Sequence, residues 1–203
     1  MFKADYESLF DRVAAHRAVL AASSEFFYQM FIQDESYSVE FDVDVFESLV
    51  VACYSGQIRV NKTNAVRLLE AATFYEMKSV VDVCCDFISR KMDETNCLDV
   101  YNLTKRLGLT SLTNRAFEMA NERFMALAKT NSFLEISLEV LTELLASSNL
   151  VVNEEEDVFD IMMLWVNHRP DQRHEHISEL LPLIRLSFLD STVEYFSWNS
   201  LLK

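Results

Sequence analysis

The chain has 203 residues, half of them hydrophobic, so it is long and apolar enough to bury one large core or two small ones, which argues against disorder. Its formal net charge is −14, from 32 acidic and 18 basic residues, without a basic cluster on a plausible helix face; this argues against direct nucleic-acid binding and favours partners with basic or apolar surfaces. No apolar segment follows a basic start, and no run reaches the roughly 18 apolar residues of a membrane span, so neither a signal peptide nor a membrane helix is predicted.

Residues 15–31 are predicted to begin as the end of a strand and to pass directly into one buried helix. Positions at helical spacing form a single stripe that would face a core. This stripe consists of Val19, Ser23, Phe26, Phe27, Met30 and Phe31.

The next segment is predicted to form a strand, a helix and a second strand. Val39, Phe41 and Val43 alternate with acidic residues, which is the pattern of a half-buried strand. A helix follows over residues 46–53 and ends at Gly56, a residue that readily adopts a positive φ. Residues 58–60 are predicted as a short strand. Residues 61–64 supply a turn and a helix cap, and two further helices follow over residues 65–72 and 80–88.

From about residue 93 onward the sequence predicts helices throughout. Apolar stripes at helical spacing cover residues 100–107, 112–124, 140–145 and 158–166. Gly108 is placed to end the first of these helices, and Asn153 with Glu156 resembles a capping box. Pro170 and Pro182 mark a loop and a helix start. With only two glycines and two prolines, the chain should be mainly helical.

Motifs for catalysis and metal binding are weak. The four cysteines lack a CxxC spacing and are predicted to be buried reduced thiols, which favours a cytoplasmic or nuclear protein. His174 and His176, near His168 and Asp171, could form a metal pair, but a solvated loop around Pro170 is the preferred interpretation. Neither a nucleophile elbow nor a phosphate-binding glycine loop is present, so no enzyme, cofactor or metal is predicted.

Three segments of the first half form continuous motifs. Residues 15–31, AHRAVLAASSEFFYQMF, are similar to the segment that opens the BTB (POZ) domain, and His16 is structural in that pattern. Residues 49–58, LVVACYSGQI, resemble its helix-to-strand passage, and residues 68–77, LLEAATFYEM, resemble its next helix.

The second half is similar to the BACK domain that follows BTB in kelch-like proteins. The matching positions include residues 144–152, LLASSNLVV, together with Trp165, Val166 and Arg173. The resemblance implies a mainly α fold with a small β-sheet: an α+β BTB/POZ domain over residues 1–92, then an all-α helical-hairpin BACK domain over residues 93–203. Kelch-like proteins continue into a propeller of repeats, which this sequence lacks, so it is either a short natural variant or a fragment.

The resemblance also implies homodimerisation. In this family an Asp on the first strand lies near the Arg of the AHR motif, and Asp5 and Arg17 are the matching positions. Phe10 completes the expected dimer interface. The usual N-terminal hairpin is shortened here and has no glycine for its turn.

Many BTB–BACK proteins are substrate adaptors of cullin-3 ubiquitin ligases, and the resemblance implies that role. The family's "hydrophobic-x-Glu" cullin contact corresponds to residues 32–34, with Asp in place of Glu. The expected cullin-facing residues are Phe31, Ile32, Asp34, Tyr37 and Tyr54. Packing of Phe31 and Tyr54 in the core or at its rim is the structural alternative. The functional alternative is a scaffold or competitor that pairs with itself or other BTB proteins without binding cullin. The substrate protein is not predicted.

Overall fold

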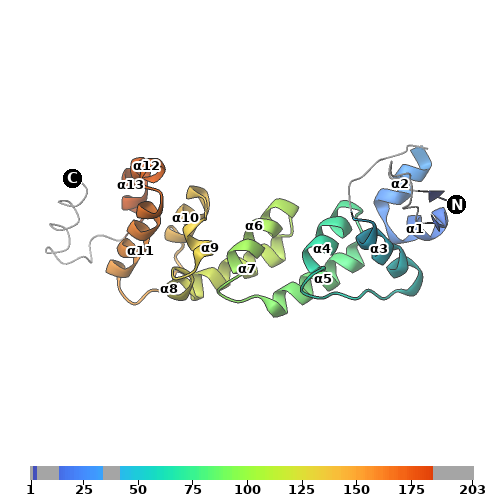
Figure 1. Cartoon of the computed structure of the whole chain (residues 1–203), viewed down its shortest axis with the longest axis horizontal. Helices are drawn as coiled ribbons and strands as arrows, with labels where there is room; N and C mark the ends of the chain where they lie inside the picture. Colours follow the sequence, from blue (N-terminus) through green and yellow to red (C-terminus); the bar gives the residue numbers. More distant parts are fainter. Residues whose placement is uncertain (1, 4–13, 34–41, 185–203) are drawn as a thin grey trace. The chain divides into compact units, whose positions relative to one another are not determined.

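The computed structural model describes residues 2–3, 14–33 and 42–184 (Figure 1). The chain divides into two compact units, residues 1–91 and 92–203, which are considered separately below. The strands of the described part are β1 (Phe2–Lys3) and β2 (Ala14–Ala15), which pair antiparallel with Phe2 opposite Ala15. Helices make up almost all the remaining secondary structure, so the mainly helical prediction is confirmed, whereas the small β-sheet of the expected BTB domain is not.

The first unit opens with two helices where one was predicted. They are α1 (Arg17–Ser23) and α2 (Glu25–Gln33), and Ser24 between them has an extended backbone with φ −153° and ψ 125°. The buried hydroxyl of Ser24 donates to the carbonyl of Tyr75 over 2.5 Å and accepts the N–H of Phe27 over 3.1 Å. Ser24 therefore caps α2 and ties it to a residue far along the chain.

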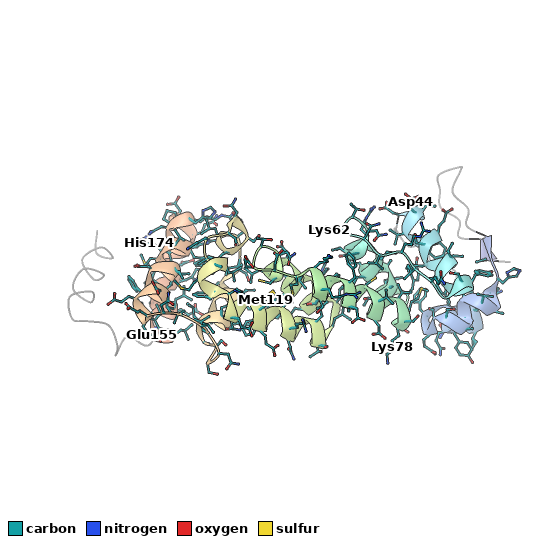
Figure 2. The ribbon with its side chains drawn as sticks, turned by 90° about the horizontal axis from the view of Figure 1, so that it is seen from below. Asp44, Lys62, Lys78, Met119, Glu155 and His174 are labelled. Carbon is teal, nitrogen blue, oxygen red and sulfur yellow. The ribbon has the colours of Figure 1, made fainter. Side chains whose placement is uncertain are left out.

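Three longer helices complete this unit: α3 (Val43–Ser55), α4 (Ala65–Phe74) and α5 (Lys78–Lys91). In Figure 2 Lys62 and Lys78 lie at opposite edges of the unit, because α4 crosses it between them and α5 returns. Aromatic rings join α2 to the other helices: the Phe27 ring stacks on Tyr75, with 5.0 Å between ring centres, and lies 6.3 Å from the Phe46 ring in a T-shaped arrangement. The packed interior also contains leucines and small residues: Leu20, Leu49, Leu68, Leu69, Ala71 and Ala72.

Of the two strands predicted around α3, only the second lies wholly within the described residues. Val43 belongs to the helix, and residues 39–41 lie outside the described part. Residues 58–60 are not a strand, because the described residues offer their backbone no ladder partner, and a strand exists only when it is paired. Gly56 does end α3, with φ 67° and its N–H bonded to the carbonyl of Ala52.

The turn before α4 forms as expected from its asparagines. The side-chain oxygen of Asn61 accepts the N–H groups of Thr63 and Asn64, and that of Asn64 accepts the N–H of Asn61 over 2.8 Å. Asn64 occupies the cap position of α4, but its side chain makes no bond to the helix.

The second unit is a succession of helices and short 3-10 turns. They are α6 (Cys97–Leu107), α7 (Thr110–Glu122), α8 (Phe124–Leu127), α9 (Asn131–Leu134), α10 (Leu138–Leu145), α11 (Glu155–His168), α12 (Pro170–Arg173), η1 (His174–His176), α13 (Ile177–Leu180) and η2 (Leu181–Leu183). Gly108 ends α6 with φ 72°, as predicted. The loop predicted around Pro170 is wrong, because Pro170 begins α12 and η1 follows directly, whereas Pro182 lies in the first turn of η2.

Two boundaries in this unit differ from prediction. The helix expected over residues 112–124 ends at Glu122, and Phe124 begins α8. The predicted capping box is wrong, because Glu154 rather than Asn153 precedes α11 and its side chain caps nothing.

The core of the second unit is centred on fully buried Phe124, Phe133 and Leu144. Trp165 on α11 donates its indole N–H to the carbonyl of Ile136 over 3.0 Å. The guanidinium of Arg173 lies 3.9 Å from the Trp165 ring and donates to the Trp165 carbonyl over 2.7 Å. Arg173 is therefore a buried cation with both an aromatic partner and a hydrogen bond, and it satisfies a carbonyl near the end of α11.

Candidate functional site

The expected cullin-facing residues are distributed over α2, α3 and a segment outside the described part. Phe31 is half-buried on α2, Ile32 beside it is 62% exposed, and Tyr54 on α3 is 49% exposed. Asp34 and Tyr37 lie outside the described residues. The packing alternative therefore fits Phe31 better than it fits Tyr54.

Arg17, an expected dimer residue, contacts Phe31, an expected cullin-facing residue. Its guanidinium donates to the carbonyl of Phe31 over 3.1 Å and lies 4.7 Å from the centre of the Phe31 ring. Asp5 and Phe10, the other expected dimer residues, lie outside the described part. Arg17 thus fixes the end of α2, a role that sequence reasoning did not assign to it.

His16 holds the end of α3 in a similar way. The Tyr54 hydroxyl accepts the backbone N–H of His16 over 2.7 Å and lies 2.6 Å from Nδ1 of the His16 ring. A hydroxyl can accept the backbone proton and still make a second hydrogen bond to Nδ1. Because His16 and Arg17 are adjacent, one dipeptide positions both Tyr54 and Phe31.

Two further exposed apolar side chains lie on the same helices as Ile32 and Tyr54. Tyr28 is 47% exposed and precedes Ile32 by four residues on α2, while Val51 is 59% exposed and precedes Tyr54 by three on α3. Residues at these spacings share a helix face. These are two exposed apolar helix faces, one with Tyr28 and Ile32 and one with Val51 and Tyr54, and we refer to them jointly as the α2–α3 apolar surface. The spacing could have indicated Tyr28 and Val51 from the sequence, but their exposure could not be read from it.

The thiols are poorly suited to nucleophilic chemistry. All four are unpaired; Cys84 and Cys97 are buried as predicted, whereas Cys53 and Cys85 are half-buried, which corrects the prediction for those two. Burial raises the pKa of Cys84 and of Cys97 to about 11, and it also raises the pKa of Cys53 and Cys85. A protonated thiol is a weak nucleophile.

Two histidines of the second unit lie near carboxylates. His168 lies 3.0 Å from Glu135, and His176 lies 3.8 Å from Glu175. Within residues 2–3, 14–33 and 42–184, no three side chains of the metal-binding types are grouped. None of the described helices combines the length and the hydropathy needed to cross a bilayer.

Two family models match the chain in succession. The BTB/POZ domain matches residues 8–92, and the BACK domain, described as "BTB And C-terminal Kelch", matches residues 97–195. The first match includes the whole α2–α3 apolar surface.

Curated relatives include several kelch-like proteins. Kelch-like protein 7 of Rattus norvegicus is 33% identical over 195 residues, which are 90% of this chain and 33% of that protein. Kelch-like protein 17 of Mus musculus is 32% identical over 184 residues, 87% of this chain and 29% of that protein. Kelch-like protein 2 of Homo sapiens is 32% identical over 184 residues, 87% of this chain and 31% of that protein. The chain spans about a third of the length of these relatives. With its BTB and BACK domains in this order, the chain belongs to the BTB–BACK proteins of the kelch-like family.

Proposed function

We propose that this chain is a non-catalytic adaptor that binds the N-terminal domain of cullin-3 through the α2–α3 apolar surface and recruits a substrate protein to a ubiquitin ligase. In this role it dimerises through its BTB domain or pairs with other BTB proteins, in the cytoplasm or the nucleus. Any catalytic effect arises from proximity of the substrate to the ligase and not from chemistry on this chain.

The observation that carries the proposal is the exposure of Ile32 beside an anchored Phe31. Ile32 is 62% exposed although it is a large aliphatic residue of a well-packed helix. Burying such a side chain in an interface is favourable by about 1.5–3 kcal/mol. Arg17 and His16 hold the ends of α2 and α3 before any partner arrives, which lowers the entropy cost of binding.

Calorimetric titration of the chain with the N-terminal domain of cullin-3 tests this proposal. We expect micromolar or tighter binding, weakened by at least about tenfold, or roughly 1.4 kcal/mol, in Ile32→Ala. Val151→Ala is the matched control, because Val151 is also an exposed aliphatic residue, at 55%, but lies in the second unit. Absence of binding by the folded chain, or equal weakening by both variants, contradicts the adaptor role.

A scaffold that pairs with itself without cullin is the second candidate. Residues 58–60 favour it, because their backbone makes no hydrogen bond to the backbone of another described residue, although the Arg59 carbonyl accepts one from the Asn64 side chain over 3.0 Å. Unpaired backbone groups can pair with another chain. Light scattering in the same experiment separates the candidates: a folded dimer that does not bind cullin-3 supports the scaffold.

A further inference from the structure

A cavity of about 520 Å³ lies in the second unit between α6, α7 and the end of α10. Its lining includes Tyr101, Lys105, Asn114, Phe117, Glu143 and Ser148. Aromatic, charged and neutral polar groups therefore converge on one space, as they do in ligand sites. This cavity is separate from the α2–α3 apolar surface, which belongs to the first unit.

Lys105 and Glu143 are the charged residues of the lining, and Glu139, an exposed residue outside the lining, also binds Lys105, so these three groups together carry one net negative charge. Lys105 Nζ lies 2.8 Å from Glu139 Oε1 and 2.7 Å from Glu143 Oε1, so two carboxylates share one ammonium. The Tyr101 hydroxyl donates to the other oxygen of Glu143. Burial raises the pKa of Glu143, but the hydrogen bonds from Lys105 and Tyr101 outweigh burial and leave this pKa lowered. Glu143 is therefore ionised at neutral pH.

An aromatic side chain and two polar side chains line the same cavity as this carboxylate. Phe117 is half-buried, and its ring centre lies 5.4 Å from that of Tyr101 at an angle of 35°. Asn114 and Ser148 are exposed, and within the described part of the chain their side chains have no hydrogen-bond partner. The cavity thus offers a flat apolar face, a carboxylate and neutral acceptors together.

We propose that this cavity binds an arginine side chain presented by a basic segment of a partner protein. The planar guanidinium packs against Phe117, donates to Glu143, and donates further to the Asn114 side-chain oxygen and the Ser148 hydroxyl. The net charge of −14 draws a basic segment toward the chain as a whole.

The chemistry of the cavity distinguishes arginine from other ligands. An anion is disfavoured because Lys105, the cation of this site, is already engaged by Glu139 and Glu143. A lysine would supply the charge, but its ammonium lacks the flat, forked donor set that can contact the ring and several acceptors together.

The proposal is tested by following the amide resonances of the ¹⁵N-labelled chain during titration with three peptides. The peptides are acetyl-Ala-Arg-Ala-amide and its lysine and citrulline counterparts, the citrulline side chain being a neutral analogue of arginine. We expect saturable shifts, confined to residues around 101–117 and 143–148, that are largest for the arginine peptide. We expect the Glu143→Gln substitution to weaken binding of the arginine peptide by about fivefold. This corresponds to the upper end of the interaction free energies of partly exposed ion pairs.

Glu118→Gln is the matched control, since Glu118 is an exposed carboxylate next to Phe117 on α7 that does not line the cavity. Asn114→Ala, a second exposed change, should weaken binding about twofold and leave the fold intact. Equal binding of the citrulline peptide, shifts located elsewhere, or no saturable shifts with any peptide at millimolar concentrations would overturn the proposal. Because the experiment contains no cullin-3, its outcome is independent of the adaptor role.

Discussion

Ser24 separates α1 from α2 through a hydroxyl that makes two buried hydrogen bonds. We predict that Ser24→Ala lowers the free energy of unfolding by about 1–3 kcal/mol, because it removes the cap of α2 and leaves the Tyr75 carbonyl without this donor. Urea unfolding monitored by circular dichroism measures the change. Ser48→Ala is the control, since the Ser48 hydroxyl only bonds the carbonyl one turn earlier in α3. Equal effects of the two substitutions would contradict the capping role.

Sequence reasoning placed Ser24 inside one continuous helix for a physical reason. The apolar stripe continues across residues 19–31, and helical spacing is the main signal available from sequence. The break depends on Tyr75, which is 51 positions away, so no local pattern contains it. The contact between Arg17 and Phe31 also could not be predicted from a local pattern, although both residues were named as candidates from the sequence.

At the scale of elements, a helix end could be predicted where a single residue decides the backbone conformation. Gly56 and Gly108 end α3 and α6 with positive φ angles, as their positions in the sequence indicated. Strands were not predictable in this way, because a strand requires a partner and residues 58–60 lack one in the described part. The start of α11 differs from the predicted start at Asn153, because several consecutive acidic residues suit the first turn of this helix equally well.

Gly108 provides a test of this account. We predict that Gly108→Ala lowers the free energy of unfolding by about 1 kcal/mol, because φ 72° strains a residue that carries a Cβ. The added Cβ would meet no atom within 4 Å, so the cost is backbone strain and not a clash. Gly108→Asn should cost less than Gly108→Ala, since asparagine tolerates this conformation. Urea unfolding compares the two variants, and the reverse order would rule out strain as the cause.

Across the whole molecule, each unit buries one thiol in its core, Cys84 in the first and Cys97 in the second. Burial raises both pKa values from 9.0 to about 11, so the folded chain retains these protons at a pH where the unfolded chain loses them. This contribution to stability is complete below pH 9 and is lost as the pH rises toward 11.

We therefore predict a fall in the free energy of unfolding between these pH values, measured by urea unfolding. The fall should be smaller in the Cys97→Ala variant than in the unmodified chain, each compared with its own stability at pH 7. An unchanged pH dependence in this variant would exclude the Cys97 thiol as a cause.

The family was accessible from sequence because its motifs are continuous segments, whereas the interaction surfaces combine residues from separate helices. Ile32 and Tyr54 could be named as candidates, but their exposure and the His16–Arg17 dipeptide that positions their helix ends required coordinates. The cavity around Glu143 was not anticipated, because Tyr101, Phe117 and Glu143 come from three helices and share no sequence motif.

Trp165 lies against the Arg173 guanidinium in the core of the second unit, and the other tryptophan, Trp198, also belongs to that unit. The first unit contains tyrosine but no tryptophan. Fluorescence excited at the red edge of indole absorption therefore reports only on the second unit. Combined with circular dichroism, which detects helices in both units, it gives a built-in optical means of distinguishing whether the BTB and BACK domains unfold together or in sequence.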